Sequence, residues 1–250
     1  MSNLKKYTLI TGASSGIGRE ISIKLSHKCN LILHGRSLER LEETKRMCND
    51  NNHIIWSCDL GSNLSISDEL IHLISSNKIV VSNFIHCAGI VTVMHARSIK
   101  SITSNKIMNI NFTSAMVITS TLLKKKINQQ ELKNVIFMSS IWSKFGARGY
   151  SLYCASKGAL DSAMRALAIE LAPIVRVNSV LLGAINTPMS EKSFSDAEIM
   201  QNINNQYPLG VGHTNDAACM VEFLLSSDSR WMTGQQIVLD GGRSINMSSK

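Results

Sequence analysis

Short apolar runs alternate with amphipathic stretches along the whole chain. The runs are rich in Val, Ile and Leu and have the length of buried strands, and the stretches between them carry apolar residues at helical spacing. The pattern predicts strands at residues 7–11, 30–34, 53–58, 80–86, 134–139, 176–182 and 235–239. It predicts helices between them, the longest over residues 101–126 and 151–171. Strands that alternate with helices indicate an α/β fold, in which helices cover both faces of a parallel sheet.

The composition is that of one globular domain. The chain has 250 residues, of which 44% are apolar and 18% are charged, which is enough for a sizeable core. No linker, repeat or low-complexity tract divides it, so we expect a single domain over residues 1–250. No apolar run approaches the length of a membrane span. The stretch before Gly12 is too short for a signal peptide, and none is expected.

The chain is basic, with a formal net charge of +8 and a pI of about 9.3. A basic balance is compatible with nucleic-acid binding. The cations are scattered, however, apart from Lys124, Lys125 and Lys126 at a helix end, where the helix dipole favours them. A 2′-phosphorylated cofactor or an anionic substrate explains the charge as well, so neither a nucleic acid nor a membrane is expected as a partner.

The cysteines show no Cys-x-x-Cys pair and no metal-ligand spacing. They are typical of small buried side chains in a reduced protein. The six are Cys29, Cys48, Cys58, Cys87, Cys154 and Cys219. We therefore predict a cytoplasmic protein without a metal site.

A glycine-rich turn lies between the first strand and the first helix, where the sequence reads Thr-Gly-Ala-Ser-Ser-Gly-Ile-Gly over residues 11–18. Gly12, Gly16 and Gly18 permit the tight turn, a close approach of backbone to a pyrophosphate, and packing of the helix on the strand. The helix N-terminus offers free N–H groups to phosphates. An ordinary strand-to-helix turn is the alternative, but the position in the chain favours a dinucleotide site.

Arg36 stands just after the second strand. Sheets that prefer NAD carry an acidic residue near this point for the ribose hydroxyls, and this chain has none there. Arg36 would instead meet a 2′-phosphate, unless it is an ordinary surface arginine at a helix start. The sequence therefore predicts NADP(H) as the preferred cofactor, with NAD(H) as the alternative.

Tyr153 and Lys157 are four residues apart on a predicted helix and so share one face. We expect the ammonium to lower the pKa of the phenol and make it a proton donor to a carbonyl oxygen. Ser140 ends the preceding buried strand and is placed to hydrogen-bond the same oxygen. A Tyr-x-x-x-Lys pair alone is often a solvated surface pair, so the case depends on the surrounding motifs. Asn111, in the middle of a predicted helix, is either an exposed polar residue or one kept for a purpose.

A polar segment follows the sixth strand. Residues 186–207 include a short predicted helix near residues 196–204, and a segment of this length suits a lid over a ligand. Phe194 and Met200 from this lid, with Trp142, Arg148 and Met189, could line the substrate pocket.

Taken together, these motifs resemble the short-chain dehydrogenase/reductase family along the whole chain. The resemblance implies a Rossmann-type, doubly wound parallel sheet of about seven strands in the order 3-2-1-4-5-6-7. Asn111, Ser140, Tyr153 and Lys157 match the family's active-site residues. The cofactor residues that it implies are Gly12, Ser14, Ser15, Gly16, Ile17, Gly18, Arg36, Asp59, Leu60, Ala88, Gly89, Tyr153, Lys157, Gly183, Ile185 and Thr187.

Three residues depart from the family pattern. The family's Asn-Asn-Ala-Gly after strand four is His86-Cys87-Ala88-Gly89 here, and its Pro-Gly after strand six is Leu182-Gly183. These changes loosen the floor of the cofactor site, where backbone contacts dominate, but remove no catalytic group. In the family's mechanism Tyr153 is the general acid, Lys157 lowers its pKa and binds the nicotinamide ribose, Ser140 polarises the carbonyl, and Asn111 holds a water that links Lys157 to solvent.

The resemblance is closest to 3-oxoacyl-[acyl-carrier-protein] reductases, which implies reduction of a 3-oxoacyl thioester. The alternatives are an enzyme of a small polar ketone or sugar and, less favoured, a non-catalytic dinucleotide-binding regulator. Of two basic patches expected for an acyl carrier protein, Lys124–Lys126 is present, whereas residues 172–175 after the Tyr153 helix carry no cation. The family also implies a homotetramer or homodimer paired through the two long helices, where Ser156, Ala159 and Ala163 would allow close packing.

Overall fold

The strands form one parallel sheet in the predicted order, β3-β2-β1-β4-β5-β6-β7. The computed structural model describes residues 4–49, 52–61, 65–190 and 197–246. The strands are β1 (Lys5–Thr11), β2 (Asn30–Gly35), β3 (Ile54–Ser57), β4 (Ile79–His86), β5 (Asn134–Ser140), β6 (Arg176–Leu182) and β7 (Gln236–Leu239). The chain order reverses between β1 and β4, and the crevice at such a point is where open α/β sheets bind ligands.

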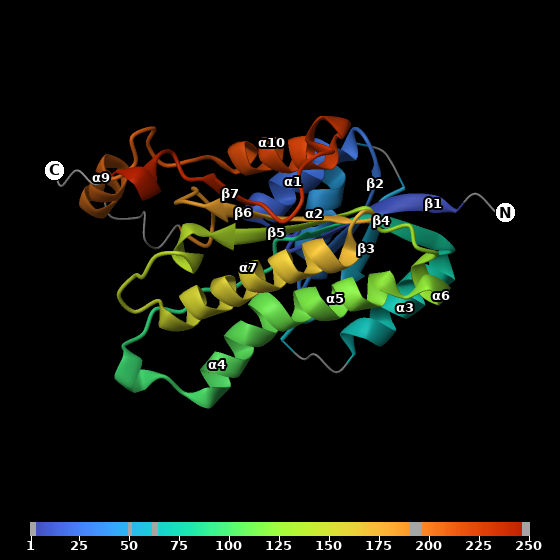
Figure 1. The fold of residues 1–250 in the computed structure, drawn as a ribbon, viewed down its shortest axis with the longest axis horizontal. Coiled ribbons are helices and arrows are strands. Elements are labelled where there is room, and N and C mark those ends of the chain that lie inside the picture. The colour runs from blue at the N-terminus through green and yellow to red at the C-terminus, as the bar shows by residue number, and fades with distance from the viewer. Residues whose placement is uncertain (1–3, 50–51, 62–64, 191–196, 247–250) are drawn as a thin grey trace.

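Helices cover both faces of this sheet (Figure 1). On one face lie α1 (Gly16–Ser26), α2 (Leu38–Met47) and α10 (Thr214–Leu225); on the other lie α3 (Ile66–Asn77), α4 (Ser101–Met108), α5 (Ser114–Leu123), α6 (Lys125–Asn128) and α7 (Ser151–Leu171). A further helix, α9 (Ala197–Asn205), lies beyond the end of the sheet. The doubly wound α/β fold is therefore confirmed.

Alternation along the strands separates two apolar cores. In β5, Val135 and Phe137 pack on the α7 side, whereas Ile136 and Met138 pack on the α1 and α10 side. All four side chains are buried, as expected for a central strand that is covered on both faces.

The predicted single helix over residues 101–126 is wrong in detail. It is interrupted by a π-helical turn at Asn109–Thr113 and ends at Leu123, after which Lys124 is extended and α6 follows. The π turn contains Asn111, whose side chain bonds to the backbone of Ile90 in another loop. Helical periodicity does not report the π turn, which is accompanied by this contact distant in sequence.

Strand β3 is shorter than predicted, since it begins at Ile54 rather than at His53. The Nδ1 atom of His53 accepts a 3.1 Å hydrogen bond from the backbone N–H of Leu31. A side chain therefore takes the place of a strand partner at this end of β2.

Candidate active site

The glycine-rich turn joins β1 to α1 and packs against the end of β4. Gly12 has a φ of +71°, and a Cβ there would lie 2.9 Å from the backbone nitrogen of Ala88. A Cβ at Gly18 would collide with the carbonyl of Gly12. Glycine is therefore required at both positions, for the close packing of the turn on β4 and of α1 on β1.

Arg19 supports this turn from behind, and motif reasoning missed it. Its guanidinium donates to the carbonyl oxygen of Ser14 at 2.7 Å, to Thr44 Oγ1 at 3.0 Å, and to the Glu43 carboxylate at 2.8 Å. These bonds link the turn to α2 and fix its backbone.

A cleft of ≈ 460 Å³ opens above the turn, at the carboxyl ends of β1, β2 and β4. Twelve of the predicted cofactor residues line it, namely Gly12, Ser14, Ser15, Gly16, Ile17, Gly18, Arg36, Asp59, Leu60, Ala88, Gly89 and Thr187. Its lining also includes His34, Cys87, Val91, Ile110 and Met189, which were not among them. An elongated group that presents phosphates to the N-terminus of α1 fits these walls.

Arg36 is exposed at the mouth of this cleft, immediately after β2. The next residue, Ser37, caps α2 by accepting from the backbone of Arg40 at 3.4 Å. The Arg36 side chain is thus free to turn toward the cleft, since the cap of the helix start is supplied by Ser37.

Lys157 lies on α7 and is buried. Its Nζ donates a 2.7 Å hydrogen bond to the carbonyl oxygen of Met138. The same Nζ lies 5.8 Å from the centroid of the Tyr153 ring. A Cβ on Gly89 would be 3.7 Å from this Nζ. The ammonium therefore lies near the Tyr153 ring and beside Gly89, which lines the cleft, although neither Tyr153 nor Lys157 lines the cleft itself.

Ser140 ends β5 beside the phenol of Tyr153. Its hydroxyl accepts from the backbone N–H of Trp142 at 3.2 Å, which fixes the oxygen at the start of the following turn. Tyr150 lies between Trp142 and Tyr153, with ring centroids 6.4 Å from each. These three rings form an aromatic wall beside Ser140. Tyr150 was not predicted, although its spacing of three residues from Tyr153 could have indicated it.

The pKa of Tyr153 departs from the prediction. Burial raises it to about 12, and the neighbouring Ser140 hydroxyl lowers it by a smaller amount. Burial also lowers the pKa of Lys157 to about 8. Desolvation disfavours the charged form of each group and is the largest influence on both pKa values. Tyr153 is therefore protonated at neutral pH.

Asn111 is fully buried in the π turn, and its amide is fully engaged. Its Oδ1 accepts from the backbone N–H of Ile90 at 2.8 Å, and its Nδ2 donates to the Ile90 carbonyl at 3.0 Å and to Ser156 Oγ at 3.0 Å. Asn111 therefore ties the loop after β4 to α7, one residue before Lys157.

The segment after β6 reaches the cleft, where Thr187, Pro188 and Met189 line it. Thr187 lies over the glycine turn, because a Cβ on Gly16 would be 3.5 Å from its side chain. Gly183, at the base, packs against Tyr207, whose hydroxyl accepts from the backbone of Ala184 at 2.9 Å. Gly183 and Ile185 support this segment and do not line the cleft. Residues 191–196 of the predicted lid, including Phe194, lie outside the described residues.

Neither a metal centre nor a membrane helix emerges from the described part of the chain. No group of three or more His, Cys, Asp or Glu side chains there could hold a metal ion. Within the same residues, no helix is both long and apolar enough to cross a membrane.

Comparison with known proteins agrees with this architecture. The family model described as enoyl-(acyl carrier protein) reductase matches residues 12–244. The chain belongs to the short-chain dehydrogenase/reductase family, whose members are nicotinamide-dependent oxidoreductases acting on CH–OH and C=O groups.

Two curated relatives are similar over nearly the full length. The chain is 34% identical over 241 residues to the 3-oxoacyl-[acyl-carrier-protein] reductase FabG of Rickettsia prowazekii, covering 95% of this chain and 96% of the relative. It is 32% identical over 252 residues to the uncharacterized oxidoreductase YmfI of Bacillus subtilis, covering 96% and 99%.

Solved structures of the same fold contain either cofactor. A 4-hydroxyisoleucine dehydrogenase complexed with NADH has a TM-score of 0.88 at 25% identity, over 96% of this chain and 99% of that one. A putative 2-deoxy-d-gluconate 3-dehydrogenase from Agrobacterium tumefaciens with bound NADP has a TM-score of 0.87 at 22% identity, over 98% of both. These structures therefore leave the choice between NAD and NADP open.

Proposed function

We propose that this chain is an NADP(H)-dependent reductase of 3-oxoacyl thioesters. The observation that carries the proposal is that Ser140, Tyr153 and Lys157 lie together, with Lys157 beside the Gly89 wall of the cleft. A protonated phenol and a fixed serine hydroxyl stand together where the cleft meets a buried ammonium. That combination serves the delivery of a proton to a carbonyl oxygen that is receiving a hydride.

Each residue has a role in this proposal. The bound nicotinamide supplies the hydride. Ser140 donates a hydrogen bond to the substrate oxygen and orients it, and Tyr153 transfers its proton to that oxygen. Lys157 stabilises the phenolate that remains and binds the nicotinamide ribose. Asn111 holds the loop at Ile90 and, through Ser156, the turn of α7 that carries Lys157.

The matching family model and the Rickettsia relative both have names that refer to acyl carrier protein. One describes an enoyl reductase and the other a 3-oxoacyl reductase. The neighbouring hydroxyl groups of Ser140 and Tyr153 could both hydrogen-bond one substrate oxygen, which supports carbonyl reduction over reduction of a carbon–carbon double bond. The thioester proposal therefore follows the 3-oxoacyl relatives.

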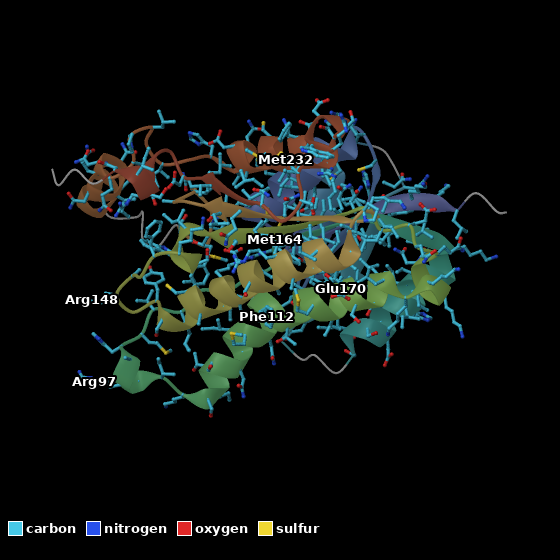
Figure 2. The ribbon with its side chains drawn as sticks, in the orientation of Figure 1. Arg97, Phe112, Arg148, Met164, Glu170 and Met232 are labelled. Carbon is cyan, nitrogen blue, oxygen red and sulfur yellow. The ribbon has the colours of Figure 1, made fainter. Side chains whose placement is uncertain are left out.

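A basic rim at the active-site end supports an anionic substrate or partner. We define the rim as Arg97, Lys100, Lys144 and Arg148, all exposed on the loops after β4 and β5. A 3.0 Å hydrogen bond from the Met94 N–H to the Gly149 carbonyl joins the two loops. Figure 2 shows Arg97 and Arg148 at the same end of the molecule. Positive charge at a site entrance attracts anions and speeds their association.

The rim also favours a second candidate, a small polar ketone that carries a carboxylate. No acidic residue lies between residues 89 and 130, nor between residues 132 and 160. Glu131, which lies between these two ranges, forms an ion pair with Lys6 at 2.9 Å, at the opposite end of the sheet. A keto acid would meet only cations on these two loops.

An NADPH-oxidation assay separates the two candidates. The same 3-oxoacyl group should be offered on acyl carrier protein and on a short thiol, beside a small keto acid and its amide. We expect the carrier-bound form to have the highest kcat/KM, and this advantage to weaken as salt screens the rim. If carrier-bound and thiol-bound groups react equally well while the keto acid exceeds its amide, the second candidate replaces the first. Tyr153→Phe controls for background oxidation.

We further propose a cytoplasmic enzyme that works as a homotetramer or homodimer. The family membership supports the assembly. The cytoplasmic location is supported by the cysteines, since all six are free thiols. One of the α7 residues expected to pair with a second subunit is buried within the subunit. Ser156 is wholly buried and bonded to Asn111, so it cannot meet a second subunit. The exposed positions of α7 are Ser151, Ala155, Ser162, Arg165, Ala166, Ile169 and Glu170.

A further inference from the structure

Asp161 is a buried carboxylate on α7 that the proposed mechanism does not use. Its side chain is 1% exposed, and neither Oδ1 nor Oδ2 has a hydrogen-bond partner among the described residues. A charged group held away from water without a partner is costly, and proteins pair such charges. The environment of Asp161 should therefore contain a compensating cation.

Lys157 is the cation placed to do this. It precedes Asp161 by four residues on α7, so the two side chains share one helix face. Lys157 is 5% exposed and directs its Nζ to the Met138 carbonyl. That bond satisfies one of its three donors but supplies no negative charge. The carboxylate of Asp161 favours the charged form of Lys157, against the burial that disfavours it.

Other groups around Lys157 do not provide this charge. From the end of β4 come His86 and Cys87, both uncharged because burial lowers the pKa of the imidazole to about 3 and raises that of the thiol to about 12. From α7 comes the neutral phenol of Tyr153. The π turn contributes only the Asn111 amide, α4 has an exposed Lys106, and β5 presents the Met138 carbonyl.

We propose that Asp161 is a positioning residue that keeps Lys157 protonated at the pH where the enzyme works. The carboxylate acts through Lys157 and does not touch substrate or cofactor. Its removal should let Lys157 lose its proton at lower pH. This inference rests on the proposed function, in which a charged Lys157 binds the cofactor ribose.

The test follows NADPH binding as a function of pH, by the fluorescence of the bound cofactor, and needs no turnover. In the unsubstituted protein we expect affinity to fall as the pH rises through about 8, where Lys157 loses its charge. In Asp161→Asn the midpoint of this fall in NADPH affinity should move down by about one pH unit. Shifts caused by a close opposite charge are usually at least this large. Asp161→Glu keeps the charge and should restore the original midpoint.

Asp68→Asn is the matched control, because it removes an exposed carboxylate from the first turn of α3. It should leave the midpoint unchanged. Asp161→Ser serves as a second neutral variant if Asp161→Asn does not fold. An unshifted midpoint in the neutral variants, with NADPH still bound, would overturn the role of Asp161. Absence of NADPH binding in every protein, Asp68→Asn included, would instead contradict the proposed function.

Discussion

Lys157 donates its 2.7 Å hydrogen bond to the carbonyl of Met138 and not to the phenol of Tyr153. The bond links α7 to the end of β5, the same strand that presents Ser140. The ammonium is therefore held at a fixed place between the cleft and the phenol. In the proposed mechanism its effect is electrostatic and depends on its protonation.

This relationship predicts an alkaline loss of ketone reduction. Tyr153 keeps its proton to about pH 12, whereas Lys157 loses its own near pH 8. Lys157 is charged below that pH and neutral above it. We therefore expect kcat/KM for reduction to be flat at neutral pH and to fall as the pH rises through about 8. Initial rates between pH 6 and 10 at constant ionic strength check this. A rate that stays level up to pH 10 would remove the ammonium from the mechanism.

Tyr153→Phe should abolish most turnover and leave cofactor affinity unchanged. The substitution removes the hydroxyl while keeping the ring that packs against Tyr150. Loss of a general acid usually costs about 10²- to 10⁴-fold in rate. Single-turnover rates and NADPH titration measure the two effects separately. Retention of more than about a tenth of the rate would exclude Tyr153 as the acid. Lys157→Ala, in contrast, should weaken cofactor binding as well.

Arg36→Asp should reverse the cofactor preference. The guanidinium at the cleft mouth would be replaced by a carboxylate that repels a 2′-phosphate and accepts from ribose hydroxyls. A charge-assisted hydrogen bond is worth roughly 1.5–3 kcal/mol, so the ratio of NADP(H) to NAD(H) efficiency should fall about ten- to a hundredfold. Arg46→Asp, at the exposed far end of α2, makes the same charge change as a control. Equal efficiency with both cofactors in the unsubstituted enzyme would refute the preference.

His86 should make the fold sensitive to acid. Thr11 Oγ1 accepts from the backbone N–H groups of Cys87 and Ala88, so its own proton goes to His86 Nδ1 at 3.0 Å. The imidazole is therefore held neutral, and burial lowers its pKa from 6.5 to about 3. Below pH 6.5 the unfolded chain takes up a proton that the folded state refuses, so stability falls as the pH falls.

His86→Asn should flatten this decline, because asparagine can still accept from Thr11 and does not titrate. Between pH 6.5 and 5 the native protein should lose about 1.6 kcal/mol through this residue, since the slope rises from half of about 1.36 kcal/mol per pH unit at pH 6.5 toward the full value below it. Urea unfolding at the two pH values gives the difference. The exposed His72→Asn should leave the decline as it is. Identical declines in all three proteins would show that His86 does not cause it.

The strands follow from local patterns and their order from the family resemblance, but three properties of the candidate site follow from neither. The glycine turn and the strand end at Ser140 are local, so the sequence predicts them. The π turn at Asn111 and the burial of Ser156 depend on bonds to Ile90 and between helices. The raised pKa of Tyr153 depends on how many groups cover the phenol, which the spacing of Tyr153 and Lys157 does not report.

The exposed face of α7 provides a test of assembly. Ile169 is 83% exposed, and on this same layer of helices Ile102 of α4 is 75% exposed. A second subunit packed on α7, as the proposed assembly requires, would cover Ile169. Ile169→Glu adds a charge to the proposed contact without touching the core. We expect light scattering at micromolar concentration to change from a dimer or tetramer toward the 27.5 kDa monomer.

Met47→Glu, at a half-exposed position of α2 across the sheet, makes the same kind of change and should leave the assembly intact. A 27.5 kDa particle already present in the unsubstituted protein would refute the pairing altogether.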